Sequence, residues 1–152
     1  MKSVSIFVLF ALSVFMLMVV VIPSPQPINT LVISADCADR ASKAPANWQV
    51  IVVRSPEELL LTLRSLVPNA KVAVAMHGDS KGLRIKGQER WNWDSYNKTV
   101  TKLGLTVYQI SCLGKGKAGD WDGKITQVGN VKYLGTKGKI LWYGLENLNK
   151  LP

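Results

Sequence analysis

Short apolar runs alternate with amphipathic segments along this chain, and the alternation predicts its elements. A continuous apolar run bounded by turn residues is typical of a strand that is buried on both faces of a sheet. Leucine or valine at every third or fourth position, after a residue that can cap a helix, predicts an amphipathic helix. We therefore expect strands at Thr30–Ala35, Trp48–Val53, Val72–Met76, Leu105–Ser111 and Val131–Leu134, and helices at Pro56–Leu66 and Ser95–Leu103.

The ends of the two helices carry local signals. Ser55 precedes Pro56 and stands three residues before Glu58, which is the spacing of a capping box. Asp94 is the expected N-cap of the second helix, and Gly104 is expected to end it.

Helices that lie between strands imply crossover connections, and crossovers give a parallel sheet. The connection Asp36–Asn47, about twelve residues long, is just long enough for a crossover and has room for a short helical turn. Asp79–Gly82 is a turn signal, and Leu83–Gly87 alternates like a hairpin arm. Ile140–Tyr143 predicts either a short strand or the start of a helix that runs to Leu148. The fold class that follows is α/β, a three-layer sandwich with a mainly parallel sheet.

One N-terminal transmembrane helix is expected to precede this domain. Val4–Ile22 is an apolar run of about 19 residues, enough to span a bilayer, and Lys2 before it favours a cytoplasmic amino terminus. Prolines at 23, 25 and 27 then form a stiff spacer. We expect residues 1–27 to be a signal anchor and spacer, and residues 28–152 to be an exported, periplasmic or extracellular domain.

Signal cleavage and secretion is the alternative for this segment. Cleaved signals usually have an apolar region of about 7–15 residues followed by a small-residue cleavage site. Val20-Val21-Ile22-Pro23 offers no such site, which favours the anchor.

The chain has a net charge of +9, and the excess of basic residues is spread through Lys71–Lys102 and Lys115–Lys139. Such a surface can attract an anionic partner, although a solvated basic face explains the same residues. No continuous Lys/Arg tract and no nucleic-acid-binding signature is present.

The candidate chemistry lies where two strands end. His77, which is the only histidine, follows the strand Val72–Met76, and Cys112 follows Leu105–Ser111. In an open parallel sheet functional groups gather at the carboxyl ends of strands, so neighbouring strands would place His77 beside Cys112. An imidazole beside a thiol can make it nucleophilic, and the Gly78 N–H can bind an oxyanion. The structural alternative is that the cysteine only packs in the core and that the histidine only forms a hydrogen bond with a loop.

The second cysteine, Cys37, also follows an expected strand, so a Cys37–Cys112 disulfide stays open in an exported domain. One histidine and two cysteines argue against a dedicated zinc site. No phosphate-binding loop or dinucleotide fingerprint occurs, and we expect no cofactor.

The stretch His77-Gly78-x-x-x-Gly82-Leu83-x-Ile85-x-Gly87, followed by a helix and a strand ending in Ser111-Cys112-x-Gly114, resembles the caspase-like cysteine peptidases. The resemblance covers about Thr30 to Gly116. It implies that His77 is the general acid and base, that Cys112 is the nucleophile, that Gly78 is an oxyanion donor and that a peptide or protein is the substrate. No residue can be named that builds a substrate pocket, so a degenerate, inactive relative also fits.

Two other function classes compete with this one. Val72–Gly78, then a helix, Gly104 and a strand running to a cysteine also look like the DsrE-like sulfur-relay proteins, in which Cys112 would carry a persulfide. A non-enzymatic, basic envelope module is the third class, because Trp91, Trp93, Trp121 and Trp142 fall in or near expected loops. The sequence does not specify the oligomeric state.

Overall fold

The computed structural model describes residues 28–111, 125–134 and 145–152. The expected anchor, Cys112, the segment Ile140–Tyr143, Trp121 and Trp142 lie outside the described residues. Within the described ranges no helix has the length and apolar character needed to cross a bilayer. The elements are β1 (Thr30–Ser34), η1 (Ala35–Lys43), β2 (Gln49–Val53), α1 (Pro56–Ser65), β3 (Lys71–Ala75), β4 (His77–Asp79), β5 (Gly82–Arg84), β6 (Trp91–Asn92), α2 (Trp93–Lys102), β7 (Thr106–Ile110), β8 (Thr126–Val128), β9 (Val131–Tyr133) and η3 (Leu145–Lys150).

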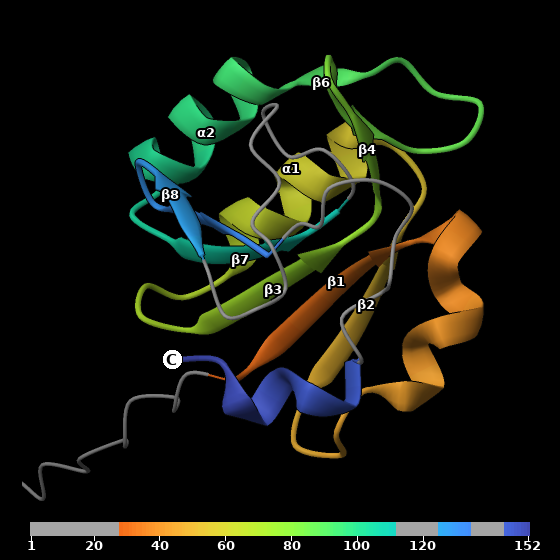
Figure 1. Cartoon of the computed structure of the whole chain (residues 1–152), viewed down its shortest axis with the longest axis vertical. Helices are drawn as coiled ribbons and strands as arrows, with labels where there is room; N and C mark the ends of the chain where they lie inside the picture. The colour runs from red at the N-terminus through yellow and green to blue at the C-terminus, as the bar shows by residue number, and fades with distance from the viewer. Residues whose placement is uncertain (1–27, 112–124, 135–144) are drawn as a thin grey trace, which may run out of the picture.

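The described strands form a six-stranded sheet in the order β2-β1-β3-β7-β9-β8 (Figure 1). The first five strands run parallel, and β8 pairs antiparallel with β9. The chain is therefore a mixed α/β protein with a mostly parallel sheet, which confirms that part of the prediction. The strand β8 was not predicted, because three residues with polar Thr126 and Gln127 leave no apolar run to detect.

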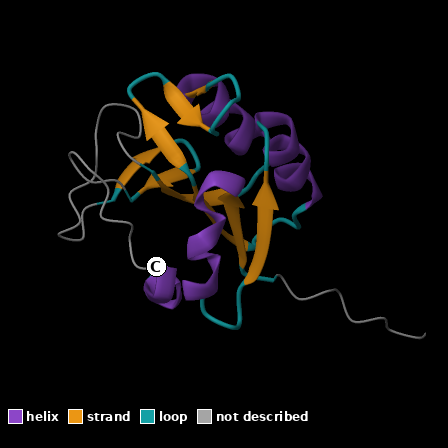
Figure 2. Ribbon diagram, turned by 90° about the vertical axis from the view of Figure 1, so that its right-hand side faces the viewer, coloured by secondary structure: helices purple, strands orange, loops and turns teal. Residues whose placement is uncertain are grey.

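Both faces of the sheet are covered, which explains why its central strands are continuous apolar runs. On one face Val32, Val72 and Val74 pack with residues of α1 and α2, and on the other face Leu31 and Ile33 pack with residues of η1 and η3. Figures 1 and 2 show the two α-helices on one side of the sheet and the two 3-10 helices on the other. The central strands can therefore place functional groups only where they end.

The N-cap of α1 is the residue that the sequence predicted, whereas the N-cap of α2 is a different residue. The Ser55 hydroxyl accepts the Glu58 N–H at 3.1 Å, as expected, whereas the Glu58 carboxylate accepts from the Arg54 N–H rather than from Ser55. The prediction of Asp94 as the N-cap of α2 is wrong. Asn92 caps this helix, because burial of Trp93 draws the first turn two residues earlier.

The hairpin after β3 is larger than predicted. His77 opens the short strand β4, and β4, β5 and β6 form a second, antiparallel sheet. The Asp79 carboxylate holds its turn by accepting from the N–H groups of Lys81 and Gly82 and from Arg90 Nε. Burial alone would raise the pKa of Asp79, but these donors hold it below its usual value. The turn that follows His77 is therefore held by the Asp79 carboxylate.

A buried polar network connects α2 to the sheet beneath it. The Tyr96 hydroxyl donates to Gln109 Oε1 at 2.6 Å, and Gln109 Nε2 donates to the Val74 carbonyl at 3.1 Å. Burial raises the pKa of Tyr96 well above its usual value, so its hydroxyl stays protonated and remains a donor. The network fixes α2 against β3 and β7, the two strands that lead to the expected site.

We predict that Tyr96→Phe lowers the free energy of unfolding by about 1–3 kcal/mol, because Gln109 Oε1 then loses its buried donor. Equilibrium urea denaturation of the full chain measures this change. Lys98→Ala, at an exposed position of the same helix, should change stability by less than about 0.5 kcal/mol. Equal effects of the two substitutions would contradict the role given to the network.

Candidate functional site

The carboxyl ends of β1, β3 and β7 meet at one edge of the sheet. Ala75 pairs in register with Ile33 of β1 on one side and with Ile110 of β7 on the other. The Met76 N–H donates to the Ile110 carbonyl at 3.2 Å, so the pairing continues one residue beyond β3. The residues that follow these three strands therefore come together at the same edge.

His77 lies at this edge, as the first residue of β4. Its side chain is 41% exposed, and its Nε2 lies 3.9 Å from Oδ2 of Asp36, the second residue after β1. At this separation the two groups are within ion-pair range but too far apart for a direct hydrogen bond.

Asp36 is fixed by the neighbouring hairpin region. Its Oδ2 accepts the Lys86 N–H at 3.1 Å, and its side chain is only 15% exposed. The carboxylate therefore keeps its position beside His77 instead of turning into solvent.

Cys37 follows Asp36 in η1 and is a free thiol that is 1% exposed. Burial raises the pKa of this thiol to about 11, and the Asp36 and Asp39 carboxylates add to the shift. The Ser34 hydroxyl and Arg40 act in the opposite direction but do not cancel it. At neutral pH Cys37 is a protonated, packed thiol rather than a nucleophile.

Of the other two expected site residues, the structure describes Gly78 but not Cys112. Gly78 lies in β4 and pairs with Leu83 of β5. Cys112 lies outside the described residues, and the last described residue before it, Ser111, is buried at the end of β7. Because β7 is the neighbour of β3, the condition on which the His77–Cys112 prediction depended is met.

Asp36 and Cys37 join His77 here, and the sequence analysis gave neither of them a role in the site. Their donor atoms and that of His77 all lie within 4.8 Å of one another. The signal that could have found them is the same as for His77, since both residues directly follow an expected strand. The sequence does not show that β1 is the other neighbour of β3, so it could not bring these two residues to His77.

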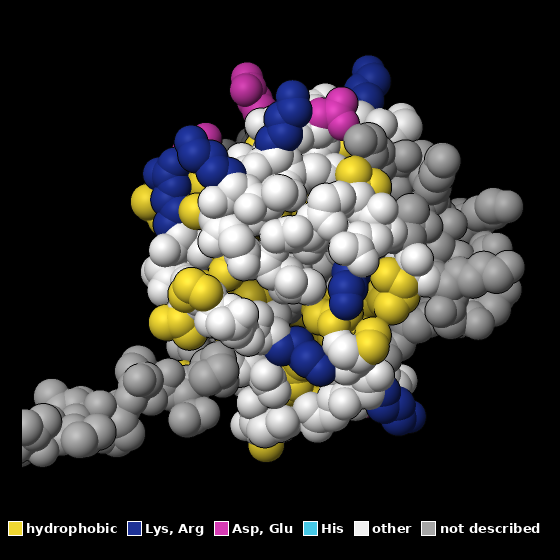
Figure 3. All heavy atoms as spheres, turned by 90° about the vertical axis from the view of Figure 1, so that its left-hand side faces the viewer, with side chains coloured by type: hydrophobic (Ala, Val, Ile, Leu, Met, Phe, Trp, Pro, Cys, Tyr) yellow, Lys and Arg dark blue, Asp and Glu magenta, His cyan; other side chains and the backbone are white. Residues whose placement is uncertain are grey.

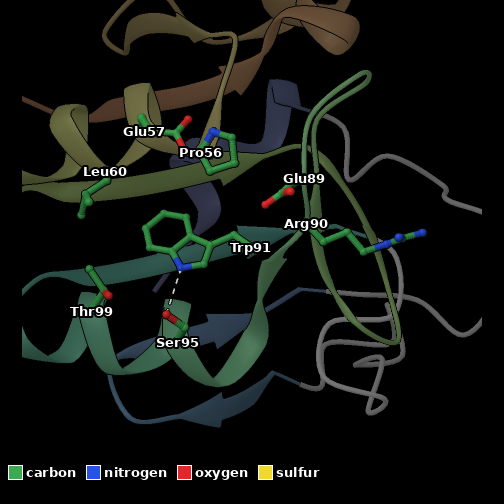
Figure 4. A pocket seen from close by; sticks show the side chains of 8 residues that line it. All are labelled: Pro56, Glu57, Leu60, Glu89, Arg90, Trp91, Ser95 and Thr99. Carbon is green, nitrogen blue, oxygen red and sulfur yellow. Dashed lines mark hydrogen bonds between the residues drawn. The ribbon is translucent and has the colours of Figure 1, made fainter.

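A separate pocket lies between α1 and α2. It has a volume of about 340 Å³, and Trp91 forms part of its wall, with its Nε1 donating to Ser95 Oγ (Figure 4). Neither His77 nor the residues of its cluster line this pocket. Trp93 is buried in the core and donates to the Asp79 carbonyl, so it packs rather than serving as a loop residue for recognition.

On the one face drawn in Figure 3 the described basic residues do not form a single patch. Figure 3 shows Lys and Arg side chains at several separate places on one face of the molecule, from its top to its base. An anionic partner therefore stays a prediction.

No protein-family model, curated protein or solved structure matches this chain significantly.

We predict that iodoacetamide labels Cys37 slowly in the folded full chain. With a pKa of about 11, only about 0.1% of the thiol is ionised at pH 8, so the rate should rise about tenfold per pH unit up to that pKa. Mass spectrometry of the Cys37 peptide measures the rate, and the urea-unfolded chain is the control with an ordinary thiol profile. A rate that levels off below pH 9 in the folded chain would show that the thiol is not buried in this way.

Proposed function

We propose that this chain is a membrane-anchored caspase-like domain, with a three-layer α/β architecture, that cleaves peptide bonds through a Cys112–His77 dyad. The observation that carries the proposal is the parallel register of β3 and β7, in which Ala75 stands opposite Ile110. His77 is two residues beyond Ala75, and Cys112 is two residues beyond Ile110. Equal offsets from a paired position favour a meeting of the two side chains at the sheet edge.

The order of elements supports the same proposal. A histidine-glycine pair after the third strand, a small antiparallel hairpin, a helix and then a strand that runs to a cysteine is the arrangement that the sequence resemblance implies. The described strands and helices follow this order from β1 to β7.

The proposed reaction begins with proton transfer from the Cys112 thiol to the His77 imidazole. The thiolate attacks the peptide carbonyl carbon, and the resulting oxyanion is bound by the Gly78 N–H. The imidazolium then protonates the leaving amine as the carbon–nitrogen bond breaks, which leaves a thioester. Water, deprotonated by His77, hydrolyses the thioester and regenerates the thiol.

Asp36 has a positioning role in this scheme. Its carboxylate lies 3.9 Å from His77 Nε2 and is held by the Lys86 N–H. Because the imidazole is positively charged after it takes the thiol proton, a fixed negative charge nearby stabilises that intermediate.

The location of the domain is part of the proposal. The apolar run before Pro23 anchors the chain in a membrane with residues 28–152 exported, so the substrate is an envelope or extracellular peptide or protein. Secretion after signal cleavage would leave the chemistry of the domain unchanged.

We predict that Cys112 is alkylated rapidly well below pH 8 and that His77→Ala removes this reactivity. A thiol with an ordinary pKa near 8.5 is only about 1% ionised at pH 6.5, so stabilisation of the thiolate by His77 should make the rate at least about tenfold higher there. The rate is measured by mass spectrometry of the Cys112 peptide from the full chain, between pH 5 and pH 9. Arg84→Ala is the matched control, because Arg84 is the exposed residue paired with His77 across β4 and β5.

The same peptide distinguishes the competing functions. Covalent capture of Cys112 by an acylating peptide probe, lost in His77→Ala, supports the peptidase. A mass gain of one sulfur on Cys112 without capture would instead indicate a sulfur carrier. An ordinary thiol profile that His77→Ala leaves unchanged would mean that the pair is inactive and that the domain serves binding.

A further inference from the structure

Three donor groups of different chemistry meet at the edge of the sheet. A carboxylate oxygen of Asp36, Sγ of Cys37 and a ring nitrogen of His77 all lie within 4.8 Å of one another. They come from two segments far apart in the chain, and the pairing of β1 with β3 brings these segments together. A cation between the three groups would touch all of them after small side-chain movements.

The donor set selects the kind of cation. Sulfur, imidazole nitrogen and carboxylate oxygen are the ligands of zinc in proteins, whereas magnesium and calcium take oxygen ligands. Around tetrahedral zinc, oxygen and nitrogen donors stand about 3.4 Å apart, and sulfur stands about 3.6 Å from either. Asp36 Oδ2 and His77 Nε2 are 3.9 Å apart, so a small shift of the imidazole toward the carboxylate would bring the two atoms within this range.

The Asp36 carboxylate gives a second, independent indication of a ligand. Its Oδ2 is occupied by the Lys86 N–H, but its Oδ1 is buried and has no hydrogen-bond partner among the described residues. A buried carboxylate oxygen without a donor is costly, and a cation bound by Oδ1 would remove that cost. The Lys86 N–H is also the kind of outer contact that orients a ligating carboxylate.

We propose that Asp36, Cys37 and His77 bind one zinc ion. Binding displaces the thiol proton of Cys37 to solvent and forms a zinc–sulfur bond, and water fills the fourth position. The scarcity of histidine and cysteine argued against a zinc site in the sequence, but this cluster needs only one of each because Asp36 supplies the third donor.

The site does not rest on the peptidase proposal, because Cys112 takes no part in it. It does have a consequence for that chemistry. An imidazole bound to zinc through one nitrogen cannot become an imidazolium, so His77 cannot act as a general base while the metal is bound. Zinc would then hold the domain in an inactive state.

Cobalt titration of the full chain carrying Cys112→Ala tests the proposal. Cys37 is the only cysteine in this variant, so a sulfur-to-cobalt charge-transfer band in the near ultraviolet can arise only from Cys37. We expect this band at one cobalt per chain, and we expect zinc to displace the cobalt. Cys37→Ala should remove the band and weaken binding by more than about 100-fold, the upper end of the loss from an outer contact alone.

Two milder variants keep the test valid if Cys37→Ala unfolds the core. Asp36→Asn and His77→Ala replace side chains outside the apolar core, and each should weaken cobalt binding at least about tenfold. Arg84→Ala is the control that should leave binding unchanged. A band that is lost in Cys112→Ala but kept in Cys37→Ala would overturn the proposal, as would binding that none of the three ligand variants weakens.

Discussion

The parallel pairing of β1, β3 and β7 is the constraint on which the rest of the structure depends. Because both faces of these strands are covered by helices, their side chains are committed to packing, and chemistry is confined to the positions just beyond them. The register between β3 and its two neighbours then decides which residues meet. His77 is the centre of that meeting, with Asp36 and Cys37 from one neighbour and Ser111 leading to Cys112 on the other.

The two cysteines have different roles in the proposed scheme. Cys37 is the buried residue of η1, and its pKa is raised to about 11, which makes it a poor nucleophile but leaves it able to bind a metal that displaces its proton. Cys112 follows the strand on the other side of His77 and is the thiol that the imidazole would activate. In this scheme His77 either activates the Cys112 thiol or binds a metal ion together with Cys37, and the presence of the metal decides which.

Much of the fold could be predicted from local patterns, because the buried strands, the α1 cap at Ser55 and the positive φ of Gly104 are each encoded within a few residues. Features that depend on distant residues could not. Asn92 and Asp94 are both good caps, and only the burial of Trp93 decides between them. The position of β1 beside β3 brought Asp36 and Cys37 to His77, and nothing near either residue encodes that order.

The central claim is that His77 and Cys112 are neighbours at the sheet edge, and an engineered disulfide tests it most directly. Neighbouring strands lie about 4.8 Å apart, within the range that a disulfide spans. His77→Cys combined with Cys37→Ala leaves two cysteines, which should form an intramolecular disulfide on mild oxidation, and Cys112→Ser should abolish it. Two thiols that stay free and separately alkylatable under conditions in which the chain remains folded would contradict the claim.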